Sequence, residues 1–251
     1  MALTLTPLPQ IPLILPGDDI TSIILNAMEK SILDMRDGDI LVLAQKIVSK
    51  SEDRLVDLAE VKPRSVALEL AQTTQKDPRL IELILKESSR VVRARPGLII
   101  VEHKLGFICA NAGIDRSNVN DDEDWVLLLP KDPDASAQLL REKLEKETGT
   151  HLGILIIDSH GRAWRKGTVG ITIGLSGLPN LIDLRGQPDL FGRELQATEI
   201  GAADELAAAA SLVMGQAAES SPIVHARGFP YPLQDSSLAD ILRPREQDLF
   251  R

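Results

Sequence analysis

The spacing of apolar residues changes along the chain between helical and strand-like periods, and this change predicts a mixed α+β protein. After Asp18 and Asp19, which can cap a helix, apolar residues recur every three or four positions at Ile20, Ile23, Ile24, Ala27, Met28 and Ile32. Short apolar runs bounded by turn residues instead predict strands at residues 40–44, 98–103, 106–110, 125–129, 153–157 and 222–228.

Four further helices are predicted from capping residues and periodicity. One begins near Pro63, and the next is capped by Asp77 with Pro78 in its first turn. A charged amphipathic stretch from Asp134 to Thr148 predicts a surface helix, and an alanine-rich stretch predicts a long helix from Glu194 to Met214. We therefore expect mixed sheets covered by helices.

The sequence contains no repeats, low-complexity segments or clean linkers, which favours one interwoven unit over separate domains. Its 251 residues allow one large domain or two smaller interleaved ones. We expect one catalytic unit over residues 1–251, built from two interleaved subdomains. Its core covers about residues 13–228, and residues 229–251 form a C-terminal tail with few apolar side chains.

Composition excludes several classes of protein. Hydrophobic content is 43% and charged content 26%, which is ordinary for a globular chain. The net charge of -9 argues against bulk binding of nucleic acid, which requires a basic face. No apolar stretch approaches the roughly 20 residues of a membrane helix, and the N-terminus lacks the pattern of a signal peptide, so we expect a cytoplasmic protein. Cys109 lies in an apolar run and is expected to be buried.

Two carboxylates follow apolar runs and mark the candidate chemistry. Asp115 lies just beyond the strand at 106–110, and Asp158 lies at the carboxyl end of the strand at 153–157. Carboxylate oxygens beside cations suit a magnesium- or manganese-bound polyphosphate. The alternative is that each aspartate only caps a turn. Taken together, the two favour a metal-dependent, nucleotide-using enzyme.

Polar and basic residues lie close to these aspartates in the sequence. Asn118 could contact a nucleotide or substrate, Ser159 could complete a metal shell, and Arg162 could hold a phosphate or carboxylate as a catalytic cation. Lys46 and Lys50 follow a strand end and could reach a phosphate, although exposed lysines often have no specific role. The sequence contains no P-loop and no dinucleotide-binding glycine motif.

Glycines punctuate residues 167–177, at Gly167, Gly170, Gly174 and Gly177. Such glycines permit close approach of the backbone either to a ligand or to a neighbouring element. Without a P-loop, tight packing is at least as good an interpretation as phosphate binding.

Four blocks of sequence together resemble the coenzyme F420 gamma-glutamyl ligases. In order, they are residues 41–50 (LVLAQKIVSK), 111–118 (NAGIDRSN), 158–162 (DSHGR) and 189–195 (DLFGREL). The resemblance extends from about Leu13 to Gly228. It implies an enzyme that joins L-glutamate to a deazaflavin coenzyme precursor through an acyl phosphate, consuming GTP and releasing GDP and phosphate. It also implies two divalent cations (Mn2+ or Mg2+), K+, and an intertwined homodimer with a mixed α+β fold.

The resemblance also assigns roles to residues. Asp115 and Asp158 would bind one metal ion, and Ser159 would help to bind the second. The residues that would face the nucleotide are Ile11, Pro12, Leu13, Ile14, Gln45, Lys46, Lys50, Asn118, Met214, Gly215, Gln216, Ala217 and Ser221. Gln216 stands where some relatives have a metal-binding glutamate, so the second metal would be held by the weaker amide oxygen of Gln216 or by Glu219 instead.

Two other functions remain compatible with the sequence. One is a related ligase that acts on a different carboxylate. The other is a non-catalytic GTP-binding protein.

Overall fold

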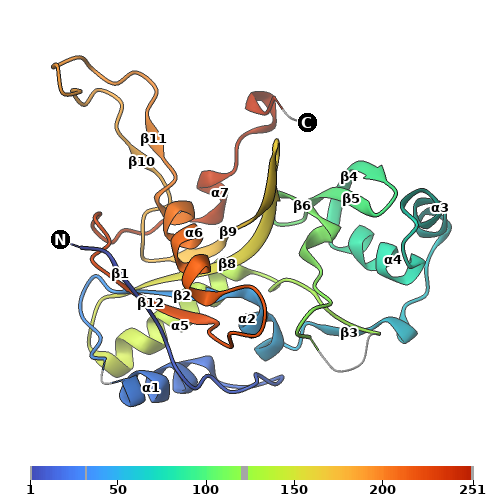
Figure 1. Ribbon diagram of the computed structural model, residues 1–251, viewed down its shortest axis with the longest axis horizontal. Helices are drawn as coiled ribbons and strands as arrows, with labels where there is room; N and C mark the ends of the chain where they lie inside the picture. The colour runs from blue at the N-terminus through green and yellow to red at the C-terminus, as the bar shows by residue number, and fades with distance from the viewer. Residues whose placement is uncertain (1, 32, 120–123, 250–251) are drawn as a thin grey trace.

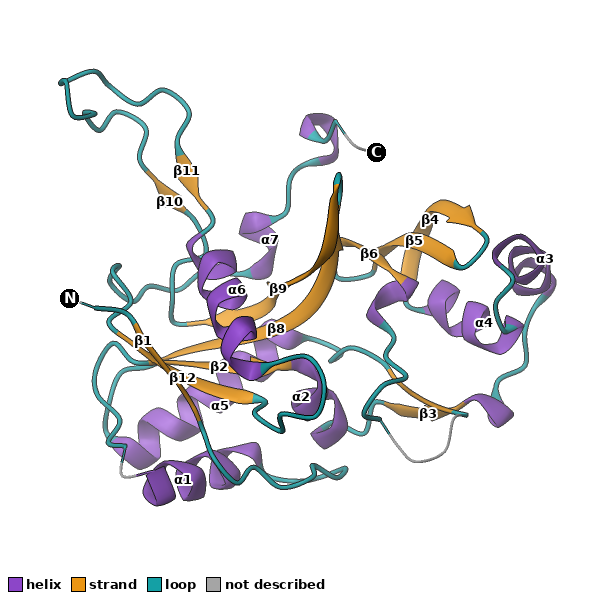
Figure 2. Ribbon diagram, viewed as in Figure 1, coloured by secondary structure: helices purple, strands orange, loops and turns teal. Residues whose placement is uncertain are grey.

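The chain folds around a five-stranded mixed sheet (Figures 1 and 2). The structure is a computed structural model that describes residues 2–31, 33–119 and 124–249, so the predicted helix position Ile32 lies outside the described residues. The strands lie in the order β1 (Thr4–Pro7), β12 (Ile223–Arg227), β2 (Ile40–Ala44), β8 (Gly153–Arg162) and β9 (Arg165–Ser176). Only β2 and β8 pair in parallel, and the other neighbours are antiparallel. The expected α+β class with mixed sheets is confirmed.

Alternating side chains of the central strands supply two hydrophobic cores, one on each face of the sheet. On one face, Leu41 and Leu43 pack in a core that includes residues of α1 (Ile20–Ser31) and α5 (Pro133–Thr148). On the other face, Ile40 and Val42 pack with the alanine-rich helix α6 (Ala202–Met214). Because both faces are covered, the strands read as continuous apolar runs.

A second lobe lies between β2 and β8 in the sequence and beside the central sheet in space (Figure 1). It contains a short β3–β7 pair, two helices and a three-stranded antiparallel sheet. The bounds are β3 (Leu55–Asp57), α3 (Ser65–Thr74), α4 (Pro78–Lys86), β4 (Ser88–Arg95), β5 (Leu98–His103), β6 (Ile108–Ala110) and β7 (Trp125–Leu127). The first of the two hydrophobic cores continues through this lobe, since it also includes Ile81 and Ile99.

The remaining elements are short. They are α2 (Gln45–Ser51), β10 (Ile182–Asp183), β11 (Glu199–Ile200), α7 (Leu238–Ile241) and the 3-10 turns at Leu58–Glu60, Asn111–Gly113 and Arg245–Gln247. The arm, which comprises β10, β11 and the residues between them, projects from the body of the chain (Figure 1). None of the helices among the described residues combines the length and apolar character needed to cross a bilayer.

Two predicted boundaries are wrong. The last long helix begins at Ala202 rather than Glu194, because Glu199–Ile200 pairs with Ile182–Asp183 and Gly201 provides the N-cap. The strand predicted at residues 153–157 does not end at Ile157. It continues as β8 to Arg162, because its second half pairs with β9 in a long hairpin. Asp158 is therefore in the middle of a strand and not at its carboxyl end.

The glycine-rich run belongs to β9 and serves close packing. A Cβ atom added to Gly170 would lie 2.5 Å from the carbonyl oxygen of Ala207 in α6. One added to Gly174 would lie 2.5 Å from the carbonyl carbon of Pro133 in α5. Both helices thus approach β9 more closely than any larger residue permits, which supports the packing interpretation of these glycines.

His103 provides a pH-dependent contribution to stability. It is 4% exposed and stacks on Phe107, with ring centroids 5.2 Å apart. Its Nδ1 accepts a hydrogen bond from the Leu105 amide at 3.0 Å, whereas Nε2 is buried without a partner among the described residues. Burial, with nearby positive groups, lowers the pKa of His103 to about 4.

We expect acidification from pH 7 to pH 5 to reduce the free energy of unfolding through His103. The unfolded chain binds a proton near pH 6.5 while the folded chain does not, so this residue alone costs about 2 kcal/mol over that interval. His103→Asn keeps a hydrogen-bond acceptor for the Leu105 amide but cannot titrate. Its free energy of unfolding, measured with urea at pH 5, 6 and 7, should therefore vary less with pH than that of wild type. Identical slopes for the two proteins would contradict the assignment.

Candidate active site

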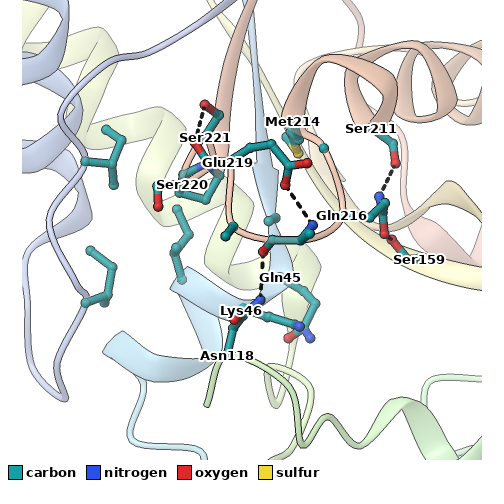
Figure 3. Close-up of a pocket in the computed structure, with 18 of the residues that line it drawn as sticks. Gln45, Lys46, Asn118, Ser159, Ser211, Met214, Gln216, Glu219, Ser220 and Ser221 are labelled. Carbon is teal, nitrogen blue, oxygen red and sulfur yellow. Dashed lines mark hydrogen bonds between the residues drawn. The ribbon is translucent and has the colours of Figure 1, made fainter. Parts of the chain in front are cut away.

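A cavity of about 350 Å³ opens beside the carboxyl end of β2 (Figure 3). Its walls are residues 11–14, the β2–α2 junction, Asn118, the middle of β8, and the loop that follows α6. Strand β2 ends at Ala44, which pairs with Ile157, so Asp158 and Ser159 of β8 have no partner on that side. The cavity opens where β2 ends beside the longer strand β8. Ligand sites in mixed sheets often lie outside strand ends in this way.

The cavity collects residues from distant parts of the sequence. Every residue predicted to face the nucleotide lines it: Ile11, Pro12, Leu13, Ile14, Gln45, Lys46, Lys50, Asn118, Met214, Gly215, Gln216, Ala217 and Ser221. Asp158 and Ser159 line it as well.

Helix α2 provides the cationic wall of the cavity. Lys46 and Lys50 are four residues apart and therefore lie on one face of the helix. Lys46 Nζ lies 3.1 Å from the Ser117 carbonyl oxygen, and Lys50 Nζ donates to the Asn118 carbonyl oxygen at 2.8 Å. Burial, together with the charge of Lys46, lowers the pKa of Lys50. Two ammonium groups held this close favour a polyanion beside them.

Asp115 lies behind this wall. Its backbone exchanges two hydrogen bonds with Leu127, both 2.9 Å, which fix the residue in an extended conformation. Gln45 Nε2 donates to Asp115 Oδ2 at 2.7 Å, and Lys46 Nζ lies 3.5 Å from the same oxygen. Burial raises the pKa of Asp115 to about 6, the charge of Asp158 adds to this rise, and Lys46 opposes it. The two predicted metal carboxylates are therefore close enough to repel each other.

Asp158 and Ser159 are neighbours on β8, so their side chains point to opposite faces of the sheet. His160 Nε2 lies 2.9 Å from Asp158 Oδ2, on the same face as Asp158. The ring of His160 packs against Phe107, with centroids 5.3 Å apart. Ser159 faces α6 and the loop that follows it. This arrangement gives the cavity a carboxylate on one side of the strand and a hydroxyl on the other.

The loop of residues 215–222 closes the cavity opposite α2 (Figure 3). Gln216 Oε1 accepts a hydrogen bond from Ser159 Oγ at 2.8 Å, and its Nε2 donates to Ser211 Oγ at 2.9 Å. Glu219 accepts from the backbone amide of Ala217 at 2.7 Å, and Asn118 Nδ2 donates to the Ala217 carbonyl oxygen at 3.1 Å. The loop is thus tied both to β8 and to the segment that carries Asp115.

Comparison with known proteins agrees with this geometry. The model of the F420-0:Gamma-glutamyl ligase family matches residues 9–228. The chain belongs to the F420-0:gamma-glutamyl ligase family. A protein named coenzyme F420:L-glutamate ligase from Methanothermobacter thermautotrophicus is 46% identical over 253 residues, which cover 100% of both chains. A ligase of the same name from Methanocaldococcus jannaschii is 46% identical over 86% of each chain. Another from Methanopyrus kandleri is 42% identical over 99% of this chain and 98% of the relative. The prediction of a gamma-glutamyl ligase is confirmed.

In this family member, Arg162 lies apart from the cavity. It is exposed, its guanidinium donates to the Lys166 carbonyl oxygen at 3.2 Å, and it belongs to the tip of the β8–β9 hairpin. It is four positions further along the strand than Asp158, which corresponds to roughly 13 Å. The single chain does not bring Arg162 to the two aspartates, and its catalytic role stays a prediction.

The cavity offers a few hard oxygen donors for a cation. The described residues contain no cluster of three or more His, Cys, Asp or Glu side chains suited to a metal ion. The oxygens in its lining include the carboxylate of Asp158, the hydroxyl of Ser159 and the amide oxygen of Gln216, and the carboxylate of Asp115 lies behind Lys46. Such a sparse set of oxygens fits Mg2+ or Mn2+, which take their remaining ligands from water and phosphate.

Sequence reasoning missed Ser211. It lies in the last turn of α6, lines the cavity and orients the Gln216 amide. A serine inside an alanine-rich helix gives no signal of such a role. Cys109 was correctly expected to be buried, and burial raises the pKa of its thiol to about 12, so the thiol is not an active nucleophile.

Proposed function

We propose that the chain is a GTP-dependent ligase that joins L-glutamate to the coenzyme F420 precursor by an amide bond, releasing GDP and phosphate. The observation that carries this proposal is a cavity lined by two lysines and Asp158, with Asp115 directly behind Lys46, in a chain of the gamma-glutamyl ligase family. Relatives with the name coenzyme F420:L-glutamate ligase support the choice of substrates.

The proposed reaction has two steps. A carboxylate oxygen of the precursor attacks the γ-phosphorus of GTP, the bond to the bridging oxygen breaks, and GDP leaves with those electrons. The amine of L-glutamate then attacks the acyl carbon of the acyl phosphate, loses a proton, and displaces inorganic phosphate. Lys46 and Lys50 hold the phosphates in line and stabilise the charge that they carry.

The carboxylates fit a divalent cation. Keeping two neighbouring aspartates ionised in a partly buried site costs free energy unless a cation neutralises them, and the raised pKa of Asp115 reflects this cost. Asp115 and Asp158 would hold one Mn2+ or Mg2+, and Ser159 with Gln216 would hold the second. Bound there, the cations would neutralise the triphosphate and polarise its γ-phosphoryl group. We also propose K+ as an accessory ion, on the family resemblance alone.

The arm suggests how two copies of the chain assemble. Leu190 is 99% exposed and Phe191 is 86% exposed, and both lie near its tip. Exposed apolar side chains on a projecting segment favour burial by another chain. We propose an intertwined homodimer in which the arm of each protomer packs on its partner.

The test is a mass spectrum of the product formed from the precursor, L-glutamate, a nucleotide and Mn2+. We expect a product heavier by one glutamate residue with GTP, together with equimolar GDP. Product with other acids but not with the precursor would show a related ligase of different substrate. GTP binding without any precursor-dependent release of GDP would contradict the proposal and leave a non-catalytic binding protein.

Lys50 provides a specific check of the nucleotide's position. Lys50→Ala removes a partly buried cation from the cavity, and we expect the KM for GTP to rise at least about tenfold, as for loss of a charge-assisted hydrogen bond. The KM for glutamate should stay within twofold. Lys146→Ala, which removes an exposed lysine from α5, is the matched control. An unchanged KM for GTP in Lys50→Ala would place the triphosphate elsewhere.

A further inference from the structure

A second cavity, of about 490 Å³, lies on the other side of the segment that carries Asp115. It is enclosed by the turn between α3 and α4 and by the residues around the 3-10 turn at 111–113. Its walls are Gln75, Lys76, Asp77, Leu80, Asn111, Ile114, Arg116 and Ser117. None of its lining residues lines the first cavity, and the proposed function does not involve it.

The wall between the two cavities is a single extended chain. The two backbone hydrogen bonds between Asp115 and Leu127 hold residues 114–116 in a strand-like conformation. Side chains alternate in such a segment, so Asp115 points toward Gln45 while Ile114 and Arg116 point into the second cavity.

The two cavities meet at the end of this wall. Ser117 lines the second cavity, and Lys46 lines the first. Lys46 Nζ is 3.1 Å from the Ser117 carbonyl oxygen and 3.2 Å from its hydroxyl. The contact between Ser117 and Lys46 thus places the second cavity directly beside the lysines of the first.

The charges around the second cavity favour an anion. Lys76 is partly buried and has no hydrogen bond or ion pair with the described residues. Asp77, the acidic residue of the lining, is already neutralised, because Arg79 donates to both of its carboxylate oxygens at 2.7–3.1 Å. The charge of Arg116 also acts on Asp77 and helps to lower its pKa. The balance of the lining is positive.

The uncharged part of the lining adds a hydrogen-bond acceptor. Leu80 and Ile114 border the cavity but are only 6% and 8% exposed, because both belong to the hydrophobic core. Asn111 Oδ1 is buried and has no hydrogen-bond partner among the described residues, so it can accept a hydrogen bond from a ligand. A free acceptor and a cation together suit a ligand that carries both a hydrogen-bond donor and an anionic group.

We propose that the second cavity binds the acid acceptor of the ligation, the carboxylate-bearing coenzyme, with an anionic group at Lys76 and a hydrogen-bond donor at Asn111 Oδ1. This inference rests on the proposed function. It leaves L-glutamate to approach the acyl phosphate from the first cavity. Lys76 is a binding residue in this scheme and does not touch the reacting atoms.

The test compares Lys76→Ala with wild type in steady-state kinetics. We expect the KM for the coenzyme acceptor to rise at least about tenfold, as for loss of a hydrogen bond to a charged group. The value of kcat and the KM values for GTP and glutamate should stay within twofold. Lys76→Arg should restore most of the affinity. Lys62→Ala, which removes an exposed lysine of the same lobe outside the cavity, is the matched control.

Equilibrium dialysis of the coenzyme acceptor against wild type and Lys76→Ala separates this inference from the proposed function. If wild type turns over and binds the acceptor but Lys76→Ala behaves identically, the second cavity is not the acceptor site. A rise in the KM for glutamate instead would overturn the assignment of the substrate. If wild type forms no product yet binds the acceptor through Lys76, the proposed function fails and the binding site stands.

Discussion

Asp115→Asn and Asp158→Asn should each reduce turnover by at least about a hundredfold, the scale of losing one preorganised electrostatic stabiliser. Each substitution keeps the shape of the side chain but removes one negative charge from the site that would hold the cation. Asp115 is partly buried beside Gln45 and Lys46, and Asp158 lies against His160, so each substitution changes a carboxylate held in a fixed position.

The control for these variants is Asp53→Asn. Asp53 is exposed, lies outside the cavity, and has a φ of 55°, which asparagine tolerates well. It should retain wild-type turnover. All three proteins should unfold at similar urea concentrations. Folded Asp115→Asn or Asp158→Asn with normal turnover at saturating Mn2+ would show that the metal assignment is wrong.

Asp39→Asn should lower the free energy of unfolding by about 3 kcal/mol, because it breaks one partner of a buried ion pair. Asp39 is 2% exposed and ends the turn that leads into β2. Arg227 of β12 donates to both of its carboxylate oxygens, at 2.9 and 2.7 Å, and His225 Nε2 lies 2.8 Å away. Burial opposes ionisation, but the hydrogen bonds from Arg227 and His225 outweigh it and hold the pKa of Asp39 far below its usual range.

Urea unfolding at pH 7 measures this effect, and Asp34→Asn is the control. Asp34 is exposed and contacts Arg227 through its backbone carbonyl oxygen, which Asp34→Asn keeps, so the free energy of unfolding should change by no more than about 0.5 kcal/mol. Because the pKa of Asp39 is lower in the folded than in the unfolded chain, its carboxylate contributes fully to the free energy of unfolding above about pH 4. This contribution is lost as the pH falls further. Equal stability of Asp39→Asn and wild type would contradict the role of this pair. Asp39 lies at the opposite end of β2 from the cavity, so KM values should not change.

Local sequence signals predicted the elements whose ends are marked by caps or turns. The helix at Pro78–Lys86 has Asp77 as its N-cap, with the Asp77 side chain accepting from the Arg79 amide, and the strand at Ile40–Ala44 is a bare apolar run. Prediction failed where pairing with a distant segment decides the structure. Residues 194–200 have helical spacing, yet two of them pair with β10 and the rest belong to the arm.

The candidate site divides in the same way. The residues of the first cavity were anticipated from family resemblance, since no periodicity in residues 11–14 or 214–221 indicates a nucleotide. The link between Ser159, Gln216 and Ser211 depends on β8 meeting the end of α6, and a single sequence does not encode that contact locally. The second cavity was also missed, because Lys76 and Asn111 come together only through the packing of α4 against the 3-10 turn.

The most direct measurement of the central claim is a crystal structure of the chain with GDP or a GTP analogue and Mn2+, recorded at a wavelength where manganese scatters anomalously. We expect an anomalous peak between the carboxylates of Asp115 and Asp158, at about 2.0–2.2 Å from oxygen ligands that include a phosphate oxygen, with the phosphates beside Lys46 and Lys50. Nucleotide bound in the cavity with no manganese between the two aspartates and the phosphates would contradict the account.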